Sequence, residues 1–442
     1  LFWFLETEAY LKRRLGRYSE TMRLYERAGE LAPGEERERM RWYRYDSLMR
    51  IHPEGAVEEL LRLTDEWEST AYYDDVLFDL ADRLVRSRRW DLIARTADIL
   101  VRSSRSFSAA RFSYIAGRAA ELGFHEAERE HIRIWYEHAV KSGCGAGAAN
   151  YYRIMAEERL EVLGMHGAAG SDGWWPFCRQ DGLGFGEWTS GGVSAEAPAA
   201  EPRVPAGADS AKILSGYIAY DLAEYAFERY GDDEELLGKL SPYTVRRWAR
   251  SLQRKDAYLE SVRLLSRSFE ASGRRIGRED VHLLYPRAYE SIMERVSEEQ
   301  GLPDYLLFAL VREESLFSDD ISSTAGAVGL SQLMPSTARD VASRIGLEVT
   351  DLTDPELNVK LGGWYLDHLI GRTESYSQAL FSYNGGITRV RRWVRNNPDL
   401  PGDLLLEAIP FKETSHYGRK VLVSAVVYGY IYRGIPIEDI IE

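Results

Sequence analysis

Apolar residues recur at spacings of three and four along the segment 6–163, which is the period of an amphipathic α-helix. Two such runs are Leu60, Leu61, Leu63 and Trp67, and Leu77, Leu80 and Leu84. Arginine and glutamate fill most of the intervening positions, as expected for solvated helix faces. The pattern therefore predicts a region that is helical almost throughout.

Short breakers divide this region into helices of about ten to twenty residues. They are Pro33-Gly34, Pro53-Glu54-Gly55, Ser103-Ser104 and Gly123. Segments such as 18–32 and 90–101 are predicted to be members of helix pairs. Because no strict repeat period is visible, residues 1–163 are predicted to form a degenerate helical solenoid, or α-superhelix. The aromatic residues on these helices are interpreted as core, with a ligand groove as the alternative: Trp42, Tyr43, Tyr72, Tyr73, Trp135 and Tyr136.

The composition changes sharply in the segment 164–211, where Gly, Ala, Pro and Ser dominate. This composition is typical of a linker or an irregular loop. Helical periodicity resumes over residues 212–284, which are predicted to form a further helical linker domain. Tyr285-Pro286 then marks a break before a last domain, residues 285–442, whose size suits an independent core. No alternating strand pattern occurs there, so the fold class predicted for the whole chain is all-α.

The overall charge and the scarcity of cysteine narrow the possible functions. A net charge of −14 argues against nucleic-acid binding, which needs a concentrated basic surface. No stretch approaches the ~18 apolar residues of a membrane helix, and residues 1–5 lack the basic start of a signal peptide. Cys144 and Cys178 are read as two thiols in preference to one disulfide. The histidines form no ligand cluster, and His125, His131 and His138 are expected on a solvated helix face.

The segment 306–315 carries the strongest chemical signal. On a helix, Leu307, Leu310 and Glu314 share one face, and Glu313 is rotated off it. A carboxyl group at the edge of an apolar face loses solvation, which raises its pKa and keeps it protonated near neutrality. Cleavage of a glycosidic bond needs such an acid, because the leaving oxygen must receive a proton. The alternative is a helix-end glutamate that reaches water or holds an ion pair.

Four motifs downstream decide between these readings. Residues 314–317 read Glu-Ser-Leu-Phe, and residues 325–338 form a glycine-punctuated turn that leads into a helix. Residues 382–386 contain Tyr-Asn, and residues 409–417 read Ile-Pro-Phe-Lys-Glu-Thr-Ser-His-Tyr. In this order the motifs resemble those of the soluble lytic transglycosylases, E-S-x-F, A-G-A-x-G-L-M-Q-L-M-P-x-T-A, A-Y-N-A-G and I-P-x-x-E-T-x-x-Y. The segment 354–358 is also similar to the family's D-P-x-x-N helix start.

The resemblance implies a lysozyme-like catalytic domain preceded by an α-superhelix. It implies that Glu314 is first the acid and then the base that cleaves the β-1,4 bond of peptidoglycan between N-acetylmuramic acid and N-acetylglucosamine. The C6 hydroxyl of the same sugar then attacks, leaving a 1,6-anhydromuramoyl end. The positions that match the family's substrate groove are Ser323, Gln332, Met334, Tyr383, Asn384, Glu413 and Tyr417.

Location and partners follow from the same resemblance. It implies no metal and no cofactor, an exported periplasmic protein, and peptidoglycan strands as the partner. Cell-wall synthesis or division proteins are candidate partners of the helical region.

Three departures from the family pattern keep alternatives open. Ser331 stands where the family has Met, which could open a gap beside the groove, and Ser382 and Gly386 flank the intact Tyr-Asn pair. A goose-type lysozyme-like hydrolase would share the fold and the glutamate but deliver water. Asp319 and Asp320 could supply its second carboxylate, although they are read as solvated loop acids. A catalytically weak peptidoglycan-binding scaffold is the remaining alternative.

Overall fold

The computed structural model describes residues 1–66, 73–142, 151–165, 214, 216–218, 221–274 and 276–441. Among these residues the regular secondary structure is α-helical, and extended pairing is confined to two isolated bridges, Ser322–Val328 and Val328–Leu333. The predicted all-α fold class is therefore confirmed. None of the described helices combines the length and apolar character that crossing a bilayer requires.

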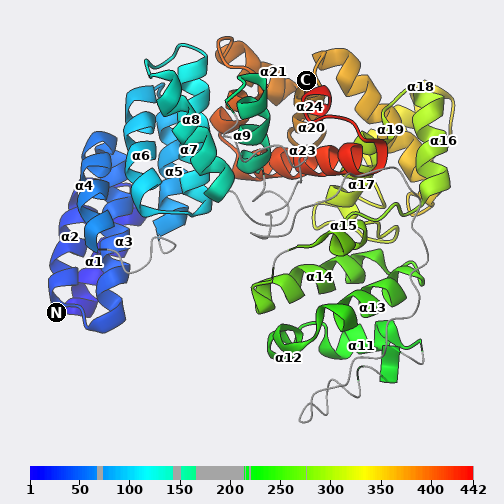
Figure 1. Cartoon of the computed structure of the whole chain (residues 1–442), viewed down its shortest axis with the longest axis horizontal. Coiled ribbons are helices and arrows are strands. Elements are labelled where there is room, and N and C mark those ends of the chain that lie inside the picture. Colours follow the sequence, from blue (N-terminus) through cyan, green and yellow to red (C-terminus); the bar gives the residue numbers. More distant parts are fainter. Residues whose placement is uncertain are drawn as a thin grey trace. The chain divides into compact units, whose positions relative to one another are not determined.

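The chain divides into two compact units. The first unit contains nine helices from the N-terminal part of the described chain and a tenth from near the C-terminus. These are α1 (Phe2–Arg14), α2 (Tyr18–Leu31), α3 (Gly34–Ile51), α4 (Pro53–Glu66), α5 (Asp74–Arg86), α6 (Trp90–Ser103), α7 (Phe107–Glu121), α8 (Arg129–Ser142), α9 (Tyr151–Val162) and α22 (Gly402–Ala408). Most consecutive helices pack side by side, as the blue-to-teal ribbons of Figure 1 show, and α4 packs on α6.

The predicted breakers end these helices. Helix α2 stops before Pro33, and α4 begins at Pro53, where a proline is tolerated because the first turn of a helix leaves its amide hydrogens without intrahelical partners. Helix α6 ends at Ser103, and Gly123 adopts a φ of +78° just after α7, a left-handed conformation that glycine adopts without strain.

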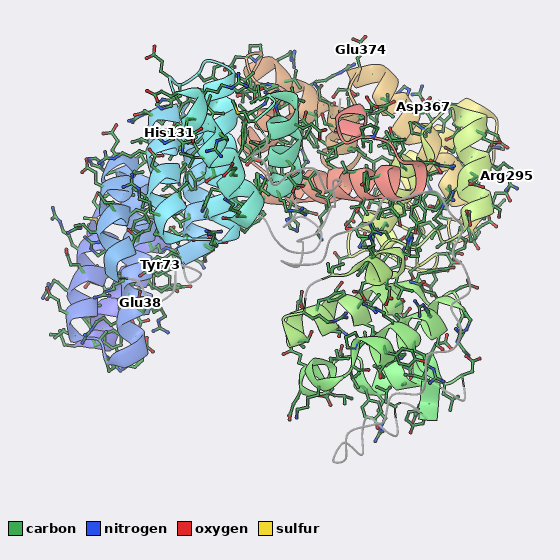
Figure 2. All side chains as sticks on the ribbon, in the orientation of Figure 1. Glu38, Tyr73, His131, Arg295, Asp367 and Glu374 are labelled. Atoms are coloured by element: carbon green, nitrogen blue, oxygen red, sulfur yellow. The ribbon has the colours of Figure 1, made fainter. Side chains whose placement is uncertain are left out.

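Repetition that the sequence does not reveal is visible in the hydrogen bonds. Many long-range polar contacts of the first unit join residues 33 to 35 positions apart. These include Arg13–Asp46, Trp42–Asp75, Glu38–Tyr73, Asp74–Ser108 and Asp98–His131. Glu38 on α3 and Tyr73, directly before α5, are labelled in Figure 2. A spacing near 34 residues is the length of one two-helix repeat, so the region is a solenoid whose sequence period has degenerated.

Most of the predicted aromatic core is buried. Tyr73, Trp135 and Tyr136 are almost fully buried, whereas Trp42 and Tyr43 are partly exposed. The expectation for His138 is wrong. Its side chain is buried, and its ring nitrogens bond Ser113 Oγ and the Ser104 carbonyl at 2.8 and 2.9 Å. Burial lowers the pKa of His138, which favours the neutral ring that such a site requires.

Residues 393–415 belong to the first unit, although they are far from it in sequence. Glu407 on α22 is fully buried and accepts hydrogen bonds from Arg111 Nε at 2.6 Å and from Tyr152 Oη at 3.0 Å. Arg111 also pairs with Asp82 at 2.5 Å, and its guanidinium lies over the Phe78 ring. This network holds α22 among α5, α7 and α9.

The second unit contains the predicted helical linker domain, residues 212–284, and most of the last predicted domain, residues 285–442. Its helices are α11 (Ala223–Tyr230), α12 (Glu234–Lys239), α13 (Pro242–Gln253), α14 (Tyr258–Ser272), α15 (Arg278–Leu284), α16 (Glu290–Gln300), α17 (Asp304–Ser315), α18 (Pro335–Ile345), α19 (Pro355–Thr373), α20 (Tyr376–Gly385) and α24 (Glu438–Ile441). Helices α21 (Ile387–Asn396) and α23 (Lys412–Arg433) each contain residues of both units.

Several expectations fall on residues that the structure does not describe. Most of the predicted linker, with Cys178, lies outside the described residues, as do Tyr72 and Cys144. The pairing of the two cysteines and the linker itself therefore remain predictions.

Candidate active site

Helix α17 positions Glu314 as its periodicity predicts. Leu307, Leu310 and Val311 are fully buried, and Glu314 continues their face in the last turn, where it is half-buried. The apolar face of α17 therefore ends in a carboxyl group that lies at the boundary between the core and solvent.

The residues after Glu314 end this helix abruptly. Ser315 Oγ donates to the Val311 carbonyl at 3.1 Å and accepts the amide hydrogen of Phe317 at 3.1 Å. Leu316 and Phe317 have φ values of +49° and +65°. Left-handed backbone at two successive non-glycine residues is strained, and such strain clusters at functional sites. The Glu-Ser-Leu-Phe motif thus joins a carboxyl group to a sharp helix end.

The surroundings of Glu314 favour its protonated form. Burial raises the pKa of Glu314 from 4.5 to about 7, and the neighbouring charge of Glu313 adds to this shift. A hydrogen bond from Tyr417 Oη to Glu314 Oε1, 2.6 Å long, acts in the opposite direction. Within the part of the chain that the structure describes, no lysine or arginine pairs with Glu314. This carboxyl group can therefore hold a proton at neutral pH and release it to a substrate.

The adjacent Glu313 has the opposite surroundings. It pairs with the buried Arg312 and accepts a 2.5 Å hydrogen bond from Ser424 Oγ on α23. Arg312 is itself fixed by a bond to the Leu284 carbonyl at 2.9 Å and lies over the Tyr285 ring. Glu313 therefore has a cationic partner, whereas Glu314 has none among the described residues, and this difference separates a structural ion pair from a candidate acid.

The glycine-punctuated motif forms a compact loop, residues 321–334, ahead of α18. Ser323 is exposed, and its hydroxyl accepts the Ala327 amide at 3.0 Å. Gln332 has a φ of +46°, and its Nε2 donates to the carbonyls of Ile321 and Gly329 at 3.1 and 2.9 Å. Met334 is 41% exposed, so it is available for contact with a ligand and is not a core residue.

Ser331 does not face open space. It is fully buried, and its amide donates to Asn358 Oδ1 at 2.7 Å. A Cβ added at Gly362 would lie 2.3 Å from Ser331 Oγ, so α19 passes directly against the Ser331 side chain. The expectation that serine opens a gap beside the groove is therefore wrong, because the side chain points at a glycine of α19.

Helix α20 carries the Tyr-Asn pair. Tyr383 Oη donates to the Ser331 carbonyl at 2.9 Å, which ties α20 to the loop 321–334. Burial, followed by the nearby charge of Glu314, raises the pKa of Tyr383 well above its usual value. Asn384 is exposed in the last turn, and Gly386 ends the helix with a φ of +80°. Ser382 is buried and bonds the Gln378 carbonyl, so this departure from the family pattern faces the interior.

The last motif lies at the start of α23. Tyr417 is nearly buried and donates to Glu314, as described above. Glu413 is exposed in the first turn of the helix and belongs to the first unit. Of the two predicted residues here, the structure therefore brings only Tyr417 together with Glu314.

Two features of this region were not expected from the sequence. Asp319 was interpreted as a solvated loop acid, but it is half-buried and accepts a 3.0 Å hydrogen bond from Tyr289 Oη. Asp320 is exposed, as expected. Asn358 is fully buried and bonds three backbone groups around the loop, although only its place in the Asp-Pro-x-x-Asn segment pointed to it.

These elements define the class of protein. Residues 291–405 match the transglycosylase SLT domain family, and this match contains the first three of the four motifs.

Its relatives include the soluble lytic murein transglycosylase of Escherichia coli K12, which is 32% identical over 160 residues, or 34% of this chain and 24% of that protein. The putative soluble lytic murein transglycosylase of Haemophilus influenzae is 31% identical over 156 residues, or 34% of this chain and 26% of that protein. The match thus spans about a quarter of the length of these relatives.

Two solved structures share the fold of the chain. The lytic transglycosylase Slt of Pseudomonas aeruginosa, solved as an inactive glutamate-to-glutamine mutant, aligns with a TM-score of 0.59 at 19% identity. That alignment covers 100% of this chain and 74% of the other. The 70 kDa soluble lytic transglycosylase of E. coli aligns with a TM-score of 0.50 at 16% identity, over 98% of this chain and 73% of the other. The helical superhelix with a lysozyme-like domain is therefore confirmed as the fold.

Proposed function

We propose that this chain is a lytic transglycosylase of peptidoglycan that cleaves the β-1,4 bond between N-acetylmuramic acid and N-acetylglucosamine. The observation that carries the proposal is Glu314, a carboxyl group whose pKa is raised to about 7 by burial and which no cation neutralises among the described residues. The printed activity of the relatives and the SLT domain support the same reaction. The inactivation of the P. aeruginosa relative by one glutamate-to-glutamine change supports a single essential carboxyl group.

The chemistry follows from one carboxyl group used twice. Glu314 gives its proton to the bridging oxygen as the bond from that oxygen to C1 of the muramoyl residue breaks. The resulting carboxylate then takes the proton of the C6 hydroxyl of the same sugar as that oxygen bonds to C1. The products are a free N-acetylglucosamine hydroxyl and a 1,6-anhydromuramoyl end, and no water is consumed. Holding the C6 hydroxyl near C1 replaces an external nucleophile by proximity.

The remaining predicted residues are proposed to hold the glycan. Gln332, Met334 and Asn384 offer amide and thioether contacts to acetamido groups and sugar faces, with Ser323 as an exposed hydroxyl nearby in sequence. Tyr383 and Tyr417 add ring surface, and Tyr417 also orients Glu314. Glu413 is proposed as a further groove residue on α23. The periplasm is the proposed location, since the substrate lies there.

The test is mass spectrometry of muropeptides released from purified sacculi by the wild-type chain and by Glu314→Gln. We expect anhydromuramoyl products from the wild type and a loss of about 10²- to 10⁴-fold in rate for the variant, the usual contribution of a general acid. Reducing-end products would replace the proposal with a lysozyme-like hydrolase. Binding to sacculi without release by the wild type would replace it with a binding scaffold.

A further inference from the structure

Asn358, near the start of α19, makes three side-chain hydrogen bonds to the loop 321–334 and its surroundings. Its Oδ1 accepts the Ser331 amide at 2.7 Å, and its Nδ2 donates to the carbonyls of Val328 and Leu352 at 3.0 and 2.8 Å. The side chain is fully buried. A buried amide with three satisfied bonds fixes geometry, because each bond that is lost leaves a desolvated polar group.

Glycines let the loop approach α19 this closely. Gly329 has a φ of +77°, and a Cβ there would lie 2.3 Å from the Leu352 carbonyl oxygen and 2.4 Å from Asn358 Nδ2. On the opposite side of the contact, a Cβ at Gly362 would lie 2.3 Å from Ser331 Oγ. The loop therefore packs closely against α19 at two positions, Asn358 and Gly362.

This contact determines where the Ser331 carbonyl points. The Ser331 carbonyl shares a peptide plane with the Gln332 amide, which donates to the Gly329 carbonyl at 3.0 Å. The left-handed backbone of Gln332 is strained and persists only when its surroundings enforce it. In this orientation the Ser331 carbonyl accepts the hydroxyl hydrogen of Tyr383 at 2.9 Å.

A tyrosine hydroxyl has one hydrogen, so its destination matters for Glu314. Tyr383 and Glu314 are near enough for the charge of Glu314 to raise the pKa of Tyr383. If the Ser331 carbonyl moved away, the ionised Glu314 would be the strongest acceptor close to that hydroxyl. A second hydroxyl donor would stabilise the ionised carboxylate and lower the pKa of Glu314.

We propose that Asn358 is a positioning residue that keeps the Tyr383 hydrogen on the Ser331 carbonyl and away from Glu314. Tyr417 is then the one hydroxyl among the described residues that donates to this carboxyl group. The inference rests on the proposed function, because it concerns the protonation of the proposed acid.

The other ionisable groups near Glu314 are held by residues other than Asn358. Glu313 on α17 is held by Arg312 and Ser424, and the charge of Glu313 acts on His416 of α23. Tyr417 on α23 donates directly to Glu314, and Tyr365 of α19 interacts with Tyr383 through its ring. None of these groups contacts Asn358, so a change in the pH profile on its replacement is assigned to Tyr383.

The experiment is the pH profile of initial muropeptide release at limiting substrate for the wild type, Asn358→Ser, Tyr383→Phe and the double variant. Since the acid must be protonated, activity falls as pH rises through the pKa of Glu314. We expect Asn358→Ser to move this alkaline limb about one pH unit lower, the scale of one hydrogen bond to a charged group. The same substitution in a Tyr383→Phe background should leave the limb where Tyr383→Phe alone puts it.

Gln300→Ala is the matched control. The Gln300 side chain also holds α19, through a 2.9 Å bond to the Lys360 carbonyl, but it does not touch the loop. Its replacement should lower the melting temperature without moving the alkaline limb. An Asn358→Ser protein that behaves like Gln300→Ala would overturn the proposal and leave Asn358 a purely structural residue.

A second pair of variants covers failure of Asn358→Ser to fold. Gly362→Ala forces Ser331 away from α19 without changing Asn358, and its Cβ also lies 3.3 Å from Tyr383 Oη. Gly362→Ala/Ser331→Gly removes the clash with Ser331 and keeps the contact with Tyr383, so the pair separates the two effects. We expect the limb to move down in the first protein and to return in the second. An unmoved limb in Gly362→Ala would also overturn the proposal. Failure of the proposed function is distinguishable, because it appears as normal release by Glu314→Gln or as no release by the wild type.

Discussion

Two glutamates that are removed from solvent, one in each unit, have different roles. One belongs to a structural ion pair and the other is the proposed acid. Glu407 in the first unit is fully buried, pairs with Arg111 and accepts the hydroxyl hydrogen of Tyr152. Glu314 in the second unit is half-buried and receives only the Tyr417 hydroxyl among the described residues. Glu407 is paired with a buried guanidinium, whereas Glu314 has no cationic partner among the described residues and burial raises its pKa.

The difference teaches that burial alone does not identify an acid. Glu407 is more deeply buried than Glu314, yet its partners make it a structural anion. The informative feature is the absence of a cation beside a carboxyl group that also reaches solvent. The neighbouring pair Glu313 and Glu314 repeats this contrast within one turn of α17.

The largest expected effect comes from removal of the buried Glu407 ion pair. Among the described residues, Glu407→Ala leaves the fully buried Arg111 with Asp82 as its one charged partner, so we expect a loss of about 3–5 kcal/mol in the free energy of unfolding. Denaturant unfolding of the whole chain measures it. The control is Glu161→Ala, an exposed glutamate on α9, which should stay within about 0.5 kcal/mol.

Replacement of both charged residues by apolar ones tests the same ion pair. Because a well-packed apolar pair can substitute for a buried ion pair, Arg111→Met/Glu407→Leu should recover much of the stability lost by Glu407→Ala. A double variant as unstable as the single one would show that Tyr152 and Asp82 carry the network.

The second effect concerns stability and pH at Glu314. The folded chain holds this proton more tightly than the unfolded chain, with a pKa of about 7 against 4.5. The resulting stabilisation is complete below about pH 4.5 and is lost as pH rises through 7, amounting to about 3 kcal/mol at most. Glu314→Gln stays neutral, so its stability relative to the wild type should increase over this range. Parallel unfolding at pH 4.5 and pH 8 tests it, and a constant difference would contradict the raised pKa.

The smallest effect is a shift in the pH profile. Tyr417→Phe removes the hydroxyl that lowers the pKa of Glu314, so the alkaline limb of activity should move up by about one pH unit at most. The position of the limb is the measurement, because the loss of ring and hydroxyl contacts to the glycan can change the rate itself. A downward shift would mean that Tyr417 does not stabilise the carboxylate.

Local patterns predicted what depends on local physics. The three-and-four spacing of Leu307, Leu310 and Glu314 was enough to place the acid at the end of an apolar stripe, and prolines and glycines located the helix ends. The prediction for His138 was wrong because its charged neighbours in sequence indicate a solvated face of α8. Its ring instead lies between Ser113 and Ser104. Periodicity gives the face of a helix but does not identify what packs on it.

Contacts between distant segments could not be predicted. Arg111 and Glu407 are 296 positions apart, and nothing in either neighbourhood indicates the other. The direction of the Ser331 side chain also depends on α19, which follows it by more than twenty residues. The loop's glycines showed that the backbone turns sharply, but not which element comes close enough to need them.

Helix α22 also bears on the exchange of domains between proteins. The SLT family match ends at residue 405, inside this helix, while Glu407 two positions later is bound by Arg111 of the superhelical unit. A recombination that transplanted the enzymatic domain alone would leave the buried Arg111 without its Glu407 partner in the donor and expose the buried leucines of α22 in the recipient. The end of the family match is thus not a position at which this chain can be divided without the loss of buried contacts. We expect the two parts to be inherited together.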